Sequence, residues 1–218
     1  LGAAVVGNLL LDTSYGSGAE AAYSVRKLRT AYTGAAMQVQ ATTGGATAEI
    51  GFDVDNNLDT ATLLAFAGTN EVGVSIWYDQ SLNGNNAAQT SVTSRPIVVA
   101  AGGALVEENG KLALFFDGTA TNGNQLTAAG FGTGSTRFAA SVQRLTQNAG
   151  GGTANYHNVF IFMEDADTGD PPLAGDFMQL NVSDASQAVK INFPTDGLDV
   201  SVNQPTNVQR LTAIQKTS

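Results

Sequence analysis

The chain has 218 residues and a mass of 22.4 kDa, a length that suits one large domain with a core of its own. Its formal net charge is −9, and its ten Lys and Arg residues are spread singly apart from a cluster at residues 26–29, so we expect no nucleic-acid partner. It contains no cysteine, which excludes disulfides, a thiol nucleophile and cysteine-based metal sites.

The N-terminal segment LGAAVVGNLLL is apolar but too short to span a bilayer, and it lacks the basic residues that open a signal peptide. We therefore expect no membrane partner. Because the chain also lacks an initiator Met, we interpret residues 1–10 as a lead-in segment and the sequence as an excerpt of a longer protein.

Two helices are predicted near the N-terminus. Residues 18–34 place apolar side chains at i, i+4 and i+7 and end in a glycine. Residues 58–68 offer Asp59 or Thr60 as N-cap, an apolar body, and Gly68 in the position after the last turn.

Short segments with period-two alternation fill most of the rest of the chain, separated by Gly, Asn, Asp and Pro. The predicted strands are 35–41, 48–52, 72–79, 95–100, 111–117, 136–145, 158–164, 176–182, 188–193, 198–203 and 207–215. Such a pattern is typical of two packed antiparallel sheets. The prediction is one all-β domain over residues 1–218, a two-sheet antiparallel jelly-roll sandwich with two short N-terminal helices. The last strand has no predicted partner, so we expect a neighbouring chain or a following segment to cover its edge.

The segment WYDQSLNGNN, residues 77–86, places two aromatic rings, a carboxylate and several amides at the end of a predicted strand. These side chains are compatible with a sugar-binding or catalytic site. They are also compatible with a strand end whose polar side chains satisfy backbone groups. Rings at Phe131 and Tyr156 are further candidates for stacking on a sugar, although aromatic residues on strands more often pack in cores.

No residue pair for nucleophilic catalysis is evident, because His157 is the single histidine and no G-x-S-x-G motif is present. Glycosidases instead need two carboxyl groups. Acidic residues at predicted strand ends or in loops are Asp79, Asp117, Glu164, Asp165 and Asp167. Because Asp is common in turns, we interpret these residues as solvated or turn-capping groups and assign no catalytic residue.

The segment DVDNNLD carries oxygen-bearing side chains at alternate positions: Asp53, Asp55, Asn57 and Asp59. This spacing matches the first half of an EF-hand loop, but Leu58 and Leu64 stand where that loop needs Gly and a bidentate Glu. An EF-hand is therefore excluded. Two readings remain: a looser calcium site, or a turn that leads to the N-cap of the second helix. Residues 164–170 form a similar acidic loop, and we predict no other metal or cofactor.

Four segments taken together resemble known families: AAYSVRKLRTAYTGAAMQVQ, IGFDVDNNLDTATLLAFAG, WYDQSLNGNNAAQ and NGKLALFFDGT. In this order and spacing they resemble the N-terminal half of the catalytic domain of fungal-type α-L-arabinofuranosidase B. They are still more similar to the concanavalin A-like (laminin-G-like) domains of bacteriophage tail and other virion proteins. The resemblance covers residues 9–120 and implies a two-sheet jelly-roll sandwich.

The enzymes of this group carry their carboxylates in the second half of the domain, where the resemblance ends. The strand that follows offers Ser135, Thr136 and Arg137 in place of their Glu, so no catalytic carboxylate carries over. We therefore expect a non-enzymatic structural or adhesive protein of a phage virion, with other virion subunits, further copies of the chain and a cell-surface glycan as partners. The alternatives are a secreted glycoside hydrolase acting on arabinose-containing polysaccharide and a carbohydrate-binding domain of a bacterial surface protein.

The resemblance also implies structural roles within the matching segments. Arg26 lies in the first predicted helix, and Asp79 and Gln80 lie at the strand end. We predict that Arg26 and Asp79 form a partly buried, charge-assisted pair that joins the helix to the sheet. The Asn- and Gly-rich turn after Gln80 would then satisfy nearby backbone groups.

Overall fold

The computed structural model describes residues 9–13, 18–116 and 124–128, together with the backbones of six strands between residues 137 and 216. The chain forms two compact units, Leu1–Phe131 and Gly132–Ser218. The strand pairs described in both units are antiparallel, which confirms an all-β chain, and the jelly-roll connection stays a prediction. The expected single domain over residues 1–218 also stays a prediction.

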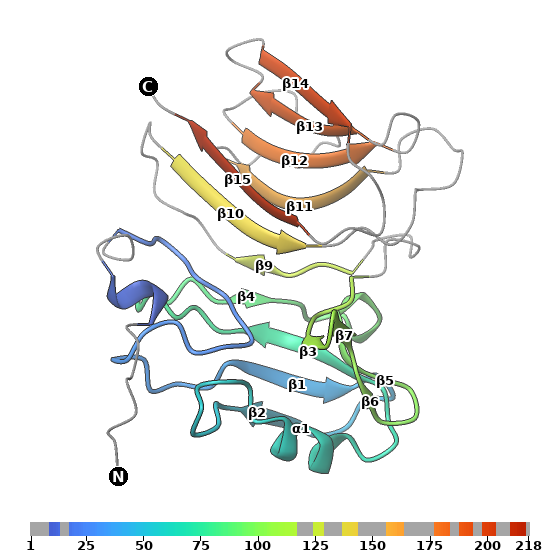
Figure 1. Cartoon of the computed structure of the whole chain (residues 1–218). Helices are drawn as coiled ribbons and strands as arrows, with labels where there is room; N and C mark the ends of the chain where they lie inside the picture. The colour runs from blue at the N-terminus through green and yellow to red at the C-terminus, as the bar shows by residue number, and fades with distance from the viewer. Residues whose placement is uncertain are drawn as a thin grey trace. The chain divides into compact units, whose positions relative to one another are not determined.

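The sheet of unit 1 is built around a central strand whose two edges are both paired (Figure 1). In sheet order its strands are β2 (Thr47–Ile50), β1 (Met37–Ala41), β3 (Val72–Trp77), β4 (Ala87–Ala88) and β9 (Thr127–Ala128). The start of β3 also pairs with β5 (Ile97–Ala100), which pairs with β6 (Ala104–Leu105). A separate hairpin joins β7 (Glu107–Glu108) to β8 (Lys111–Leu112), and short 3-10 helices lie at η1 (Leu10–Asp12) and η2 (Val92–Ser94).

The core of unit 1 follows from the alternation of side chains along its strands. Its buried apolar residues include Met37, Val39, Ile50, Leu63, Val72, Val74, Val98 and Val99. The helix α1 (Thr60–Ala67) contributes Leu63 and Ala67 to this core. Across the described part of the chain, no helix combines the length and apolar character that crossing a membrane requires.

The second predicted helix is confirmed as α1. Asp59 is its N-cap, because the carboxylate accepts hydrogen bonds from the backbone N–H of Thr62 at 3.0 Å and from the Thr62 hydroxyl at 2.6 Å. These bonds lower the pKa of Asp59. At the other end Gly68 adopts φ 57° and donates its N–H to the carbonyl of Leu64. A glycine suits this position because it reaches positive φ without strain.

We expect Asp59→Ala to lower the free energy of unfolding of unit 1, because α1 loses the side chain that caps its first turn. Urea unfolding followed by the fluorescence of Trp77, the chain's single tryptophan, measures this change. Asp55→Ala is the matched control, since Asp55 is exposed and only its backbone N–H is hydrogen-bonded. Equal effects of the two substitutions would contradict the capping role.

The first predicted helix, residues 18–34, is wrong. This segment is irregular apart from a single antiparallel bridge between Arg26 and Asn57. Its backbone groups bond to residues far along the chain: the N–H of Lys27 donates to Asn56, and the carbonyl of Val25 accepts from Leu58. The i, i+4, i+7 pattern was therefore misleading, because tertiary partners satisfy the backbone in place of a helix.

Unit 2 contains two groups of strands. A meander pairs β11 (Tyr156–Met163), β12 (Phe177–Ser183), β13 (Ala188–Phe193) and β14 (Leu198–Asn203) in chain order. The first and last strands of the unit, β10 (Arg137–Gln143) and β15 (Arg210–Lys216), pair with each other over their full lengths. The last predicted strand therefore has a partner within the chain along one edge, and the expectation that another chain or a following segment covers its edge stays a prediction.

Candidate functional site

The loop after β3, residues 78–86, is built around the carboxylate of Asp79, which is 3% exposed. One carboxylate oxygen accepts hydrogen bonds from the backbone N–H groups of Ala22 at 2.9 Å and Ser81 at 2.8 Å. The other accepts from the Ser81 hydroxyl at 2.6 Å and from the N–H of Asn85 at 3.1 Å. Four donors thus surround a buried charge, which is how a carboxylate is stabilised without a cation.

The predicted ion pair between Arg26 and Asp79 is wrong. Arg26 is exposed, and among the described residues no ion pair joins it to Asp79. The expectation was correct in one respect, since Asp79 does hold the N-terminal segment to the sheet. It does so through the backbone of Ala22 because this segment runs extended and its N–H groups are open to side-chain acceptors.

Gln80 makes a second set of bonds to the same segment, and its side chain is fully buried. The amide oxygen accepts from the N–H of Leu28 at 2.7 Å. The amide nitrogen donates to the carbonyls of Ser24 at 3.2 Å and Arg26 at 3.0 Å. The backbone N–H of Gln80 donates to the carbonyl of Ala22. One glutamine therefore fixes the path of residues 22–28.

The asparagines of the loop hold the adjoining residues. The side-chain amide of Asn83 donates to the carbonyls of Ala19 and Glu20, and that of Asn85 donates to Glu20. The Tyr23 hydroxyl donates in turn to the carbonyl of Asn85. The polar side chains of this loop thus bind backbone groups of residues 19–28, and the loop acts as a structural clamp. It is not the sugar site that its composition allowed.

Two tyrosines of this region have raised pKa values. Burial and the negative charge of Asp79 raise the pKa of Tyr23 to about 12. Tyr23 also packs against Trp77, with ring centroids 5.8 Å apart. Burial and a hydrogen bond to Glu49 raise the pKa of Tyr78 to about 12. The hydroxyl groups of both tyrosines are therefore held by contacts within unit 1.

These pKa values predict how stability depends on alkaline pH. Unfolded tyrosines lose their protons near pH 10, whereas the folded chain holds these two until about pH 12. The stabilisation is thus complete below pH 10 and is lost as the pH rises towards 12. Urea unfolding monitored by Trp77 fluorescence should show this decline. The double variant Tyr23→Phe, Tyr78→Phe should decline less steeply, and an equal slope would contradict the assignment.

The calcium candidates are accounted for by local structure. One oxygen of Asp53 accepts from the N–H groups of Asp55 and Asn57, both at 2.9 Å, and so closes a turn. Asp59 caps α1. The described segments contain no group of three or more His, Asp or Glu side chains that would suit a metal. The turn reading is therefore the one that the geometry supports for residues 53–59, whereas residues 164–170 lie outside the described part.

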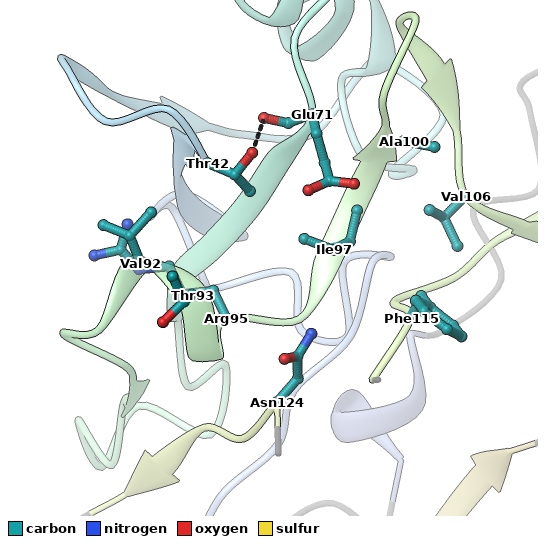
Figure 2. A pocket seen from close by; sticks show the side chains of 10 residues that line it. All are labelled: Thr42, Glu71, Val92, Thr93, Arg95, Ile97, Ala100, Val106, Phe115 and Asn124. Carbon is teal, nitrogen blue, oxygen red and sulfur yellow. Dashed lines mark hydrogen bonds between the residues drawn. The ribbon is translucent and has the colours of Figure 1, made fainter. Parts of the chain in front are cut away.

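A pocket of about 460 Å³ lies elsewhere in unit 1 (Figure 2). It lies beside the end of β1 and the start of β3. Its other walls come from η2, from β5 and from the segments around residues 106, 115 and 124. Its polar lining residues are Thr42, Glu71, Thr93, Arg95 and Asn124. Its apolar lining residues are Val92, Ile97, Ala100, Val106 and Phe115. The lining residues come from six separate parts of the chain, so no local sequence motif predicts this pocket.

Arg95 fixes one wall of the pocket and is 7% exposed. Its guanidinium donates to the carbonyls of Gln89 at 2.9 Å and Thr90 at 3.1 Å and to the side chain of Gln40. Burial lowers its pKa. The neighbouring strand leaves room for it at Gly73, where an added Cβ would lie 2.9 Å from the Cβ of Arg95.

Most carboxylates considered for catalysis do not fall in described parts of the structure. Asp79 is committed to the clamp. Asp117, Glu164, Asp165 and Asp167 lie outside the described residues, as do Phe131, Ser135 and Thr136 and the side chains of Arg137, Tyr156 and His157. Among the described residues, Glu71 is the carboxylate that lines the pocket, and the sequence patterns did not single it out.

No family model matches the chain, and no curated protein matches it by sequence. Solved structures do match it in fold. A GH54 α-L-arabinofuranosidase soaked with a cyclic sulfate inhibitor has a TM-score of 0.60 and 19% identity, over 90% of this chain and 46% of that one. An arabinofuranosidase complexed with arabinofuranosyl-α-1,2-xylobiose has a TM-score of 0.58 and 18% identity, over 90% and 45%. A mutant GH54 enzyme soaked with 4-nitrophenyl α-L-arabinofuranoside has a TM-score of 0.59 and 18% identity over the same shares. The chain thus spans less than half the length of these enzymes.

These matches correct the functional expectation. They support the part of the resemblance that names arabinofuranosidases, and the part that names phage tail and virion proteins has no support. The expectation of a non-enzymatic virion protein is therefore wrong, and the expected place in the virion has no support. The error came from giving one position too much weight, because a Glu missing near residues 135–137 does not decide whether other carboxylates serve. Association with further copies of the chain stays a prediction.

Proposed function

We propose that the chain is a glycoside hydrolase of the arabinofuranosidase type, which removes arabinofuranosyl residues from a polysaccharide outside the cell. The observation that carries this proposal is the fold shared over 90% of the chain with arabinofuranosidases that were complexed or soaked with arabinofuranosyl compounds or a cyclic sulfate inhibitor. The same similarity favours a sandwich of two packed sheets. The low content of charged residues, 13%, accords with a neutral polar surface that meets a neutral polysaccharide.

The reaction requires two carboxyl groups. In retaining glycosidases they lie roughly 5 Å apart, and one is the nucleophile while the other is the acid and then the base. In inverting enzymes they lie roughly 6.5–9.5 Å apart, with a water molecule activated between carboxylate and sugar. Asp79 is not a candidate for the catalytic pair, because its carboxylate accepts four hydrogen bonds that hold the loop and the N-terminal segment in place. The proposal draws the pair from the carboxylates that the sequence places at predicted strand ends or in predicted loops, which are Asp117, Glu164, Asp165 and Asp167.

The test uses the full chain and 4-nitrophenyl α-L-arabinofuranoside. We expect release of 4-nitrophenol above the uncatalysed rate. Carboxamide variants at the four loop carboxylates should include two that slow the reaction by roughly 10²–10⁴-fold, the usual contribution of an acid or base. Azide should restore activity to the variant that lacks the nucleophile of a retaining enzyme, because it replaces the missing group.

The matched control is Asp55→Asn, an exposed carboxylate on a turn, which should retain full activity. No release from the arabinofuranoside by the folded chain would overturn the proposal. Release from an aryl xyloside or glucoside alone would overturn the arabinofuranosyl specificity.

A further inference from the structure

The carboxylate of Glu71 is an open acceptor in the pocket of unit 1. Its side chain is half-buried and has no hydrogen-bond partner among the described residues, although its backbone carbonyl accepts from Thr42. In Figure 2 the carboxylate points into the pocket, and the amide of Asn124 points into it from the opposite side. A carboxylate only accepts hydrogen bonds, whereas an amide both donates and accepts. Together they suit the hydroxyl groups of a sugar, each of which can do both.

The facing wall of the pocket is apolar. Phe115 is 43% exposed, and Ile97 and Val106 lie beside it. An exposed ring next to convergent polar groups is the usual composition of a small-ligand site. The flat face of a sugar ring carries C–H groups that pack on an aromatic ring, while its hydroxyls point to the rim. The pocket volume of about 460 Å³ falls within the range of such sites.

The charges of the pocket select a neutral sugar. Glu71 repels a ligand carboxylate, because like charges at short range are unfavourable. Arg95, the cation in the lining, is buried and held by protein oxygens of Gln89, Thr90 and Gln40. It therefore does not present its guanidinium as a fork to an acidic ligand.

The walls of the pocket are held in place by backbone hydrogen bonds. Phe115 and Ile97 exchange a pair of bonds, both at 2.9 Å. The residue after Asn124 is tied on both sides, since the N–H of Gln125 donates to Ser94 at 3.0 Å and the carbonyl of Gln125 accepts from the Gln89 side chain. A site that exists before its ligand arrives loses less free energy to ordering when it binds.

From these contacts we propose that the pocket of Glu71, Phe115 and Asn124 binds a neutral sugar residue of the polysaccharide and takes no part in cleaving it. The inference rests on the proposed function for the identity of the polysaccharide. Glu71 accepts hydrogen bonds from sugar hydroxyls, Asn124 bonds a neighbouring hydroxyl, and the ring packs on Phe115. The pocket retains the chain on the polymer, and cleavage occurs at the separate carboxyl pair.

The experiment measures binding and hydrolysis separately on the full chain. Binding is read from retardation in native gels that contain neutral debranched arabinan, and hydrolysis from 4-nitrophenyl α-L-arabinofuranoside, which is too small to need a second sugar site. We expect Phe115→Ala and Glu71→Gln to weaken arabinan binding by about 10-fold or more, about 1.4 kcal/mol. Both variants should keep kcat/KM on the aryl glycoside within about twofold of wild type, a change that corresponds to less than 0.5 kcal/mol.

Phe116→Ala and Glu107→Gln are the matched controls. Phe116 is 46% exposed and adjoins Phe115 but does not line the pocket, and Glu107 is an exposed carboxylate outside it. Equal retardation of Phe115→Ala, Phe116→Ala and wild type would overturn the inference. Loss of aryl-glycoside hydrolysis in Glu71→Gln would overturn it by making Glu71 catalytic. Stronger retardation by polygalacturonate than by arabinan would overturn the neutral ligand. Failure of the proposed function alone would give a different result: arabinan binding that depends on Phe115, without hydrolysis of the aryl glycoside.

Discussion

Asp79→Asn is expected to lower the free energy of unfolding of unit 1 by about 2 kcal/mol, since at least one backbone N–H donor loses its acceptor. Asn keeps one oxygen and replaces the other by an amide nitrogen. The new amide can take two orientations. In the first its nitrogen faces the N–H groups of Ala22 and Ser81. In the second its nitrogen faces the Ser81 hydroxyl and the N–H of Asn85. In the first orientation two N–H groups face an N–H donor. In the second the N–H of Asn85 does, while the Ser81 hydroxyl can turn towards the carbonyl of Glu20 and accept. Urea unfolding followed by Trp77 fluorescence measures the loss.

The control for this substitution is Asp53→Asn. Asp53 is exposed and uses one oxygen for both of its hydrogen bonds, which Asn reproduces. Its effect should stay within about 0.5 kcal/mol, as for other surface substitutions. A loss of less than about 1 kcal/mol in Asp79→Asn would contradict the clamp, because each unsatisfied buried donor alone costs about that much.

Gln80→Glu is expected to have the largest effect, a loss of about 4 kcal/mol at neutral pH, because it strands a charge in a fully buried site. The new carboxylate faces the carbonyls of Ser24 and Arg26, which have lost their donor. Burial raises the pKa of such a carboxyl in the folded state. The loss is therefore small below the unfolded pKa of about 4.3 and grows as the pH rises through the folded value.

Unfolding of Gln80→Glu at several pH values between acid and neutral tests this dependence. The matched control is Gln125→Glu, an exposed side chain, which should show little loss at any of these values. A penalty in Gln80→Glu that does not change with pH would show that shape, and not charge, is the cause.

Local patterns predicted the elements whose stabilising contacts are local. The helix α1 was evident from its caps, Asp59 and Gly68, and β13 and β14 from alternation and turn residues. The segment of residues 18–34 carried an equally regular apolar pattern, with Ala21, Val25 and Leu28 in register. It does not form a helix because its N–H and C=O groups find better-placed partners more than 25 residues away, such as Gln80 and Leu58. The sequence of residues 18–34 alone does not reveal these distant hydrogen-bond partners.

The two candidate sites differ in the same way. The segment of residues 77–86 stood out because its polar side chains are consecutive, and the interpretation of Asp79 as an anchor was correct in place but wrong in partner. The pocket of Glu71, Phe115 and Asn124 did not stand out, because each residue is ordinary in its own segment. They are brought together by the pairing of β5 with β3, by the bridge between Phe115 and Ile97, and by the hydrogen bond from the N–H of Gln125 to Ser94.

The pairing of β10 with β15 has a consequence for how unit 2 folds. The meander from β11 to β14 joins strands that follow one another in the chain, so each pair brings together neighbouring parts of the sequence. The β10–β15 ladder instead joins the two ends of the unit, and its entropy of closure is much larger while the intervening chain is disordered. Once the meander has formed, the loop that the β10–β15 ladder must close is effectively shorter. The ladder of Arg137–Gln143 with Arg210–Lys216 should therefore form late, and it sets the folding rate of the unit.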